Sequence, residues 1–320
     1  MLDPIICVKD IAWIRLKSPD LSLAEQYLTD FGLVLSERTP DALYMRGTDP
    51  EHHIHVTERG DAAVTAIAFW ARCEEDLYRL SREARGASGV ESLDEPGGGK
   101  RVRLIDNNGI GIEVVWGVQR LAALPVESYP LNFGHSNKHA RAGDLLRVSQ
   151  RPSRVKRIGH AVLSTPVIAD SVAWMNRHLG IVRSDEVHAE GDPHTLVASF
   201  NRIDGGEAYV DHHVIMFGRF HTAGLNHVSF EVQDLDDLAI GHEWLMQKYP
   251  DLHVWGLGRH TLGSQIFDYW RDPWGRQHEH WTDSDVLNCN HEYRMHTQSK
   301  GLRSQWGPQA PQIFRDAASR

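Results

Sequence analysis

The feature that most constrains the fold of this 320-residue chain is an internal repeat that relates its two halves. The stretch DFGLVLSE at 30–37 corresponds to HLGIVRSD at 178–185. In both halves a strand-like segment and a helix-like segment precede this stretch. The strands are expected at 9–16 and 157–163, and the helices at about 21–31 and 168–178. Equivalent elements in equivalent order predict that one structural unit occurs in both halves.

The first of these helices has recognisable ends. Ser22 followed by Glu25 matches a capping box, which predicts Ser22 as the N-cap. Gly32 is a natural C-terminal stop, because glycine accepts the left-handed conformation that often ends a helix.

The correspondence continues further along each half. VTAIAFWA at 64–71 resembles LNHVSFEV at 225–232, and each strand-like segment leads into acidic residues and a second helix. Residues 103–116 and 270–281 then both read as strand, tight turn and strand. We therefore predict four strand–helix–strands units in an α+β fold with two tandem domains. The domains are expected at 1–147 and 148–288, followed by a carboxyl-terminal tail at 289–320.

Composition excludes several classes of protein. The 34 Lys and Arg against 43 Asp and Glu leave a net charge of −9, which argues against a general nucleic-acid binder. No window approaches 18 uncharged apolar residues and the amino terminus lacks a signal-peptide core, so we expect no membrane association. The three scattered cysteines fit a reducing, cytoplasmic environment. The 20 histidines indicate a metalloenzyme.

Aligning the halves selects three residues from this large set of histidines and carboxylates. At equivalent strand positions the second half carries three potential metal donors, His160, His227 and Glu279. The first half carries Trp13, Ala66 and Glu113 at those positions and cannot supply the same donors. We therefore predict a metal site in the second half and none in the first.

Two imidazoles and one carboxylate suit a divalent first-row metal with open coordination positions, as in non-haem Fe(II) enzymes. A structural zinc site would require four ligands, commonly cysteines, and none lies near. Fe(II) is the expected ion, and Mn(II) accepts the same ligands.

The residues around these positions carry further motifs. His260 is followed nine residues later by Tyr269, and then by Pro273-x-Gly275-x-x-x-Glu279. His213, in HVIMF, precedes His227 by fourteen residues. In this order the motifs resemble those of the type I extradiol catechol dioxygenases, such as catechol 2,3-dioxygenase and 2,3-dihydroxybiphenyl dioxygenase. These enzymes belong to the vicinal oxygen chelate superfamily, whose domains each contain two βαβββ modules.

The resemblance implies a function and a set of roles. The protein would insert both atoms of O₂ into a catecholic ring next to one hydroxyl, in aromatic catabolism, and would form a homo-oligomer. His160, His227 and Glu279 would hold the metal. The catalytic residues would be His213, His260 and Tyr269: His213 as acid/base, with His212 as the alternative, and the other two as hydrogen-bonding partners of the diol oxygens.

The sequence departs from the family at two places. Leu262 and Gly263 stand where many members have Asn and Asp, and Asp268 stands where an apolar residue usually precedes the tyrosine. Both changes affect the expected pocket rather than the metal ligands. The alternatives are the same chemistry on a trihydroxylated ring, a glyoxalase-type isomerase, or a binding module without chemistry.

Two other groups of histidines have structural interpretations. His52, His53 and His55 lie in the half that lacks the donor set, and we expect them to be structural. His278 and His280 flank Glu279, so strand alternation predicts that they point to the opposite face from that carboxylate.

Overall fold

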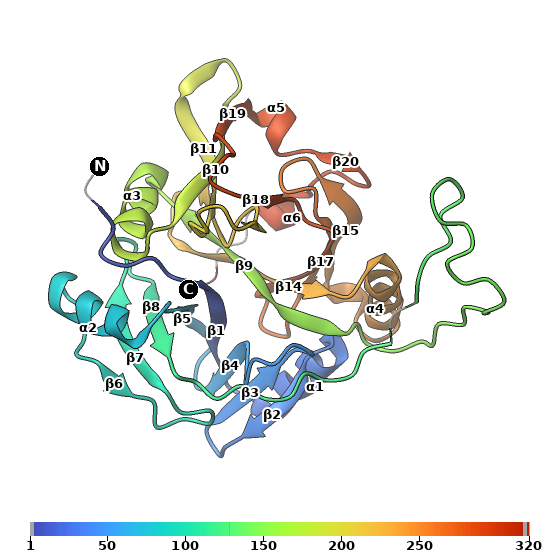
Figure 1. Ribbon diagram of the computed structural model, residues 1–320, viewed down its shortest axis with the longest axis horizontal. Helices are drawn as coiled ribbons and strands as arrows, with labels where there is room; N and C mark the ends of the chain where they lie inside the picture. Colours follow the sequence, from blue (N-terminus) through green and yellow to red (C-terminus); the bar gives the residue numbers. More distant parts are fainter. Residues whose placement is uncertain (1–2, 128, 316–318, 320) are drawn as a thin grey trace.

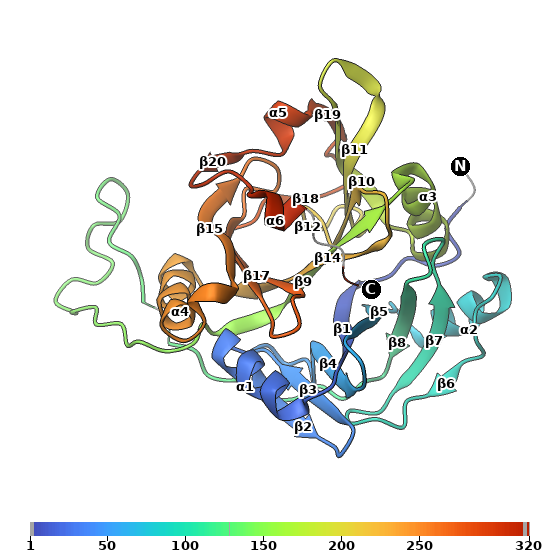
Figure 2. The ribbon, with the colours of Figure 1, turned by 180° about the vertical axis from the view of Figure 1, so that it is seen from behind.

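The computed structural model describes residues 3–127, 129–315 and 319, and its strands form two large sheets, one from each half of the chain (Figures 1 and 2). The first sheet has eight strands in the order β2-β3-β4-β1-β5-β8-β7-β6. The second has ten in the order β19-β10-β11-β13-β9-β14-β17-β16-β15-β20.

The first half contains two copies of a strand, a helix and three strands. The first copy is β1 (Asp10–Ser18), α1 (Leu21–Phe31), β2 (Val34–Arg38), β3 (Ala42–Arg46) and β4 (His55–Arg59). The second copy is β5 (Ala63–Trp70), α2 (Glu74–Glu83), β6 (Glu91–Ser92), β7 (Lys100–Ile105) and β8 (Gly111–Trp116).

The second half repeats this plan. Its first module is β9 (Val155–Thr165), α3 (Ile168–Leu179), β10 (Val182–Ala189), β11 (Asp192–Arg202) and β13 (Ile215–Arg219). Its second is β14 (Gly224–Val232), α4 (Leu235–Lys248), β15 (His253–His260), β16 (Ile266–Arg271) and β17 (Gln277–Thr282). A short 3-10 helix, η1 (Pro250–Leu252), precedes β15, and β12 (Val210–Asp211) pairs with β18 (Val286–Leu287). The predicted α+β fold with two βαβββ modules in each half is confirmed.

The strand register explains why three donors converge in the second sheet. On β9, β14 and β17, His160 pairs with Ser229, and Ser229 pairs with Glu279. His227 lies two residues before Ser229 on β14, and it pairs with Gln277. Side chains two residues apart on a strand share a face. The His227 side chain therefore lies on the same face of the sheet as those of His160 and Glu279.

The first sheet has the same register. Trp13 pairs with Ala68 and Ala68 pairs with Glu113, while Ala66 lies two residues before Ala68 on β5. The positions aligned from the sequence are therefore equivalent in the two sheets.

The N-cap of helix α1 is Asp20, the residue before its first helical position. The Asp20 carboxylate accepts hydrogen bonds from the backbone N–H groups of Ser22 at 2.9 Å and Leu23 at 3.0 Å. The prediction of Ser22 as N-cap is wrong, because a carboxylate two residues earlier already satisfies the free N–H groups of the first turn. Gly32 ends the helix in the left-handed conformation, with φ 109°, as predicted.

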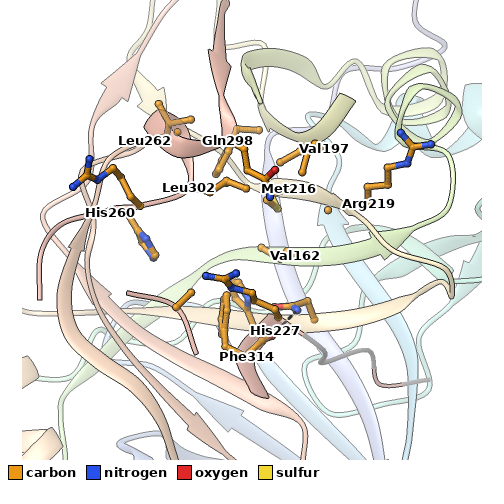
Figure 3. A pocket seen from close by; sticks show the side chains of 18 of the residues that line it. Val162, Val197, Met216, Arg219, His227, His260, Leu262, Gln298, Leu302 and Phe314 are labelled. Atoms are coloured by element: carbon orange, nitrogen blue, oxygen red, sulfur yellow. Dashed lines mark hydrogen bonds between the residues drawn. The ribbon is translucent and has the colours of Figure 1, made fainter. Parts of the chain in front are cut away.

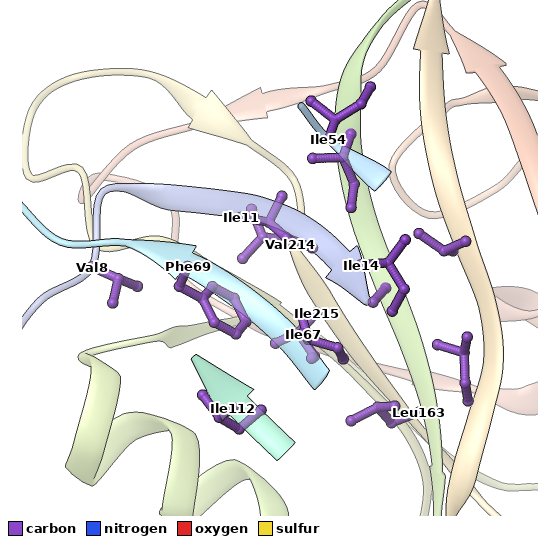
Figure 4. Packing of buried hydrophobic residues seen from close by; sticks show 14 of the residues in the cluster. Val8, Ile11, Ile14, Ile54, Ile67, Phe69, Ile112, Leu163, Val214 and Ile215 are labelled. Carbon is purple, nitrogen blue, oxygen red and sulfur yellow. The ribbon is translucent and has the colours of Figure 1, made fainter. Parts of the chain in front are cut away.

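Both sheets share one hydrophobic core. A single buried cluster includes Ile14 and Ile67 of the first sheet with Leu163 and Ile215 of the second (Figure 4).

The back of β17 also packs on the first half. The His280 ring stacks on Phe31 with 3.8 Å between ring centroids, and His280 Nε2 donates to the Phe31 carbonyl at 2.6 Å. His278 stacks on His55 at 5.5 Å, so the residues flanking Glu279 point away from its face, as predicted.

The carboxyl-terminal segment extends both edges of the second sheet. Strand β19 (Arg294–Thr297) pairs in parallel with β10, and β20 (Ser304–Trp306) pairs with β15. Helices α5 (Gln298–Gly301) and α6 (Gln312–Arg315) complete it. The connector between the sheets, at 117–154, makes a long excursion away from them (Figure 1). None of the described helices is long and apolar enough to cross a membrane.

Candidate metal centre

The side chains of His160, His227 and Glu279 meet on the inner face of the second sheet. Glu279 Oε2 lies 3.1 Å from His160 Nε2 and 3.4 Å from His227 Nε2. All three side chains are buried, and the donor atoms lie within 4.8 Å of one another. Each donor comes from a different strand, so the geometry depends on the sheet and not on a flexible loop.

The environment of Glu279 fits a bound cation. Both of its carboxylate oxygens are buried without a hydrogen-bond partner among the described residues, and no lysine or arginine of that part of the chain pairs with it. Burial alone would raise the pKa of Glu279, but contacts with His160, His227 and His260 hold this pKa well below its usual range. The structure therefore buries a carboxylate anion that lacks a fixed positive charge.

Each of the two imidazoles can offer a nitrogen lone pair to a cation beside this carboxylate. Burial lowers the pKa of His160, so its ring is neutral, and its Nδ1 has no hydrogen-bond partner in the described structure. His227 Nδ1 lies 2.7 Å from the Asn226 side-chain oxygen, which can only accept, so this nitrogen carries the proton. His227 Nε2 is then free to ligate, an arrangement typical of histidines that bind metals.

In the first half, arginine side chains pair with the equivalent carboxylate. Glu113 Oε2 accepts from Trp13 Nε1 at 3.1 Å and from Arg15 Nε at 3.4 Å, and its Oε1 accepts from Arg101 Nη1 at 3.0 Å. Two guanidinium groups thus supply the positive charge that is missing around Glu279. The comparison supports a cation site in the second half alone.

His213, rather than His212, faces the pocket. The His213 ring lies 4.2 Å from that of His160, centroid to centroid, and it lines the pocket wall. His212 points the other way, with Nε2 2.8 Å from Asp185 Oδ2. Asp185 Oδ1 lies 2.8 Å from His296 Nε2 on β19.

This chain of contacts determines the tautomer of His213. Burial raises the pKa of Asp185, but hydrogen bonds from His212 and His296 lower this pKa by more than burial raises it. Asp185 is therefore an anion that accepts from both histidines. His212 Nε2 then carries a proton, and its Nδ1 accepts the 3.1 Å hydrogen bond from His213 Nδ1. His213 Nε2 is left with a lone pair. Burial also keeps the pKa of His213 well below its ordinary value, so the ring is neutral.

His260 and Tyr269 form a hydrogen-bonded pair beside the metal donors. The Tyr269 hydroxyl lies 2.8 Å from His260 Nε2, and the Tyr269 ring lies 5.1 Å from that of His227. Burial, followed by the nearby Glu279 carboxylate, raises the pKa of Tyr269 well above its usual value, so the phenol is protonated.

These side chains line a pocket with a volume of about 810 Å³. Figure 3 shows His227 beside Phe314 at one end, and Leu262, Leu302 and Met216 at the other. Its wall is largely apolar, with a few convergent polar groups, as small-molecule sites are. Much of this wall comes from the carboxyl-terminal segment, which includes Phe314.

Sequence reasoning missed Asp185, Asn226, His296 and Phe314. The repeat held a signal for the first, because Glu37 occupies the corresponding position in the first half. Glu37 lies 3.7 Å from His52 Nε2, and His52 Nδ1 lies 3.1 Å from His53 Nδ1, which mirrors the arrangement of Asp185 and its histidines.

The histidines of the first half therefore retain the layout of the second half without its donor set. Among the residues that the structure describes, none of His52, His53 and His55 belongs to a group of three potential metal donors. Their structural interpretation agrees with this.

Two known proteins that resemble this chain in sequence are ring-cleaving dioxygenases by name. No family model matches the sequence. Metapyrocatechase 2 from Cupriavidus necator is 26% identical over 314 residues, which cover 97% of this chain and 92% of that protein. A manganese-dependent 2,3-dihydroxybiphenyl 1,2-dioxygenase from Geobacillus genomosp. 3 is 22% identical over 275 residues, covering 81% and 80%.

Solved structures agree over the whole fold. The Mn(II)-bound glyoxalase from Novosphingobium aromaticivorans has a TM-score of 0.79 and 25% identity, covering 98% of this chain and 96% of that one. Homoprotocatechuate 2,3-dioxygenase from Brevibacterium fuscum, in complex with 3,4-dihydroxyphenylacetate, has a TM-score of 0.81 and 19% identity, covering 99% and 95%. The chain is a relative of the extradiol dioxygenases and has the vicinal oxygen chelate fold.

Proposed function

We propose that the protein is an extradiol dioxygenase, which cleaves a catecholic ring next to one hydroxyl and inserts both atoms of O₂. The observation that carries this proposal is the buried Glu279 carboxylate beside two imidazoles, which line a pocket of about 810 Å³. The similarity to dioxygenases over nearly the whole chain supports it.

His160, His227 and Glu279 are the proposed ligands of Fe(II) or Mn(II). Two neutral nitrogens and one anionic oxygen leave open positions and one net positive charge, which a singly deprotonated diol neutralises. The chemistry that such an ion supplies is the activation of the diol and of O₂ side by side.

His260 and Tyr269 are proposed to hold the diol and take its proton. Because the Tyr269 phenol is protonated, it accepts a proton from the diol only as it passes its own to His260 Nε2, 2.8 Å away. The pair therefore acts as a short relay, and the stacked Trp255 ring, 5.2 Å from the Tyr269 ring, holds the phenol in place.

His213 is the proposed acid/base on the opposite side of the pocket. Its Nδ1 is committed to His212, so its Nε2 lone pair is the group that can take up a proton and return it to an oxygen of the reacting O₂. Because His212 and Asp185 hold His213 in this tautomer, its neutral ring can take up the proton directly. It does not first have to lose a proton to solvent.

A metal-dependent isomerase is the second candidate, because the Mn(II)-bound glyoxalase shares both fold and 25% identity with this chain. Such an enzyme would be expected to draw ligands from both halves. Trp13 and Ala66 supply none, and arginines already pair with Glu113. Ring cleavage of a trihydroxylated substrate is a further candidate. Leu262 and Gly263 lack the polar groups that many extradiol dioxygenases carry at these positions.

Two broader inferences rest on the family resemblance: the partners would be a small catecholic substrate and O₂, and the protein would assemble as a homo-oligomer. The three free cysteines support a third, that the protein acts in the cytoplasm.

The test is anaerobic purification with metal analysis, followed by O₂ uptake on catechols, biphenyl diols and trihydroxybenzenes. We expect one Fe or Mn in this site, stoichiometric O₂ consumption and a new visible absorbance from the ring-cleaved product. Glu279→Gln should abolish uptake, and Glu113→Gln, at the equivalent position of the first half, should retain it. Bound metal without O₂ uptake on any diol would refute the dioxygenase and favour the isomerase. A His160→Ala variant that keeps full affinity for a diol would instead indicate a binding module.

A further inference from the structure

A second cluster of two histidines and a carboxylate lies outside the pocket. His242 is on α4, His253 begins β15, and Asp268 is on β16. Asp268 directly precedes Tyr269, so its side chain points to the opposite face of the sheet, beneath α4. His242 Nδ1 lies 3.1 Å from Asp268 Oδ2, and His253 Nε2 lies 3.0 Å from Asp268 Oδ1.

The spacing of these donors matches that of the candidate metal centre. The nitrogen-to-oxygen distances there are 3.1 and 3.4 Å, and here they are 3.1 and 3.0 Å. In the part of the chain that the structure describes, these are the two groups in which three potential ligand atoms lie within 4.8 Å of one another. With ligand bonds of about 2.0–2.2 Å, donor atoms around one tetrahedral zinc ion lie roughly 3.3 Å apart, close to the observed spacing.

Among the described residues, no lysine or arginine pairs with the buried Asp268 carboxylate. Its exposed fraction is 0%, and its side-chain partners there are His242, His253 and the Trp270 indole, which donates to Oδ2 at 2.5 Å. A buried charge is costly unless an opposite charge offsets it.

The backbone leaves space for the Asp268 carboxylate, and solvent reaches the two histidines. Gly256 lies opposite Asp268 on β15, and a Cβ atom there would come within 2.5 Å of Asp268 Oδ1. The side chains of His242 and His253 are 19% and 21% exposed, so an ion can approach the cluster from their side although Asp268 is closed off.

We propose that His242, His253 and Asp268 form a second, structural site for a divalent cation of the zinc class. Two imidazoles and one carboxylate suit such a borderline ion, and water would complete its tetrahedral coordination. The ion would tie α4 to β15 and β16, and the Trp270 indole would hold the carboxylate oxygen that it contacts. The site is separate from the proposed catalytic centre and does not depend on the proposed function.

The experiment measures zinc bound to chelator-treated protein after loading with Zn²⁺ and removal of free ion. Zn²⁺ also occupies sites built for Fe(II), so we expect two equivalents on the wild type and one on Glu279→Gln. His242→Gln and His253→Gln should each bind one equivalent. The double variant Glu279→Gln/His242→Gln should bind none. His194→Gln, which removes an exposed histidine on β11, is the matched control and should bind two.

The result that overturns the proposal is a Glu279→Gln variant that binds no zinc, or a double variant that binds as much zinc as Glu279→Gln. The first outcome would mean that the histidines themselves neutralise Asp268. Because a variant could perturb folding, a second measurement uses the wild type alone. A zinc-edge anomalous difference map of Zn²⁺-soaked crystals should show a peak among His242, His253 and Asp268, and a peak at Glu279 without one here would refute the site.

Discussion

Replacing Glu279 by glutamine should cost far more stability with metal than without it. Without metal, the buried Glu279 carboxylate contacts His160, His227 and His260, and no arginine or lysine of the described chain pairs with it. Burial of the charge destabilises the fold, but these contacts, which lower its pKa, stabilise it, so Glu279→Gln should change the free energy of unfolding of the metal-free protein by no more than ~1 kcal/mol.

With metal the difference should be large. An ion that binds only the folded state adds about 2.7 kcal/mol at 100 times its dissociation constant and about 4.1 kcal/mol at 1,000 times. Glu279→Gln loses most of this gain because it loses the anionic ligand. The wild type should therefore become more stable than the variant by roughly 1–3 kcal/mol in saturating Mn(II).

The internal repeat provides the control. Glu113→Gln changes the equivalent residue, where Arg15 and Arg101 pair with the carboxylate. Breaking this buried network should cost about 3 kcal/mol, the lower end of the range for such pairs, because Arg15 keeps Glu58 and Glu95. This loss should be the same with chelator and with Mn(II).

The assay is urea unfolding of the three proteins, followed by tryptophan fluorescence, in chelator and in Mn(II). A Glu279→Gln variant that loses the same stability in chelator and in Mn(II) would refute the reasoning, since it would show that the carboxylate does not hold the ion. If Mn(II) stabilises Glu113→Gln by a different amount from the wild type, the two sites are not independent.

Three further predictions concern individual side chains. Burial lowers the pKa of His53 to about 3, below the ordinary 6.5, so the unfolded chain takes up this proton first and stability falls as pH drops from 6.5 towards 3. Between pH 7 and 5 the wild type should lose ~2 kcal/mol more than His53→Gln in urea unfolding, and parallel losses would contradict the assignment. His296→Phe removes one of the two histidines that hold Asp185 and should lower kcat roughly 10-fold at unchanged metal content, an effect within the range for partners of catalytic groups. An unchanged pH–rate profile and an unchanged kcat would exclude this positioning role. Phe314→Ala should raise KM for the best aromatic diol about 10-fold, in line with ~1–3 kcal/mol for an apolar side chain in a pocket, whereas an unchanged KM would place the substrate elsewhere.

The sequence contained enough information to bring the metal donors together because sheet register is a repeated local property. His160, His227 and Glu279 lie at strand positions that recur in the first half, and a shift of one residue would have moved any of them to the other face. The module plan was predictable for the same reason.

The remaining parts of the site depend on contacts between segments far apart in the chain. His296 reaches Asp185 only because β19 pairs with β10, more than a hundred residues earlier, and the tail has no period that predicts this pairing. Phe314 reaches the pocket from a short helix near the end of the chain. Asp268 was visible as a departure from the family, but its histidines come from α4 and β15, so only the fold shows the cluster.

The packing of β17 on the first half has a consequence for folding. The strand that carries Glu279 presents its other face to Phe31 and His55, through His280 and His278. Neither half can open without exposing this shared face, so the two should melt in one cooperative transition, and a fragment cut at the connector should lack an ordered β17. The half without metal donors thus helps to hold in place the strand that carries Glu279.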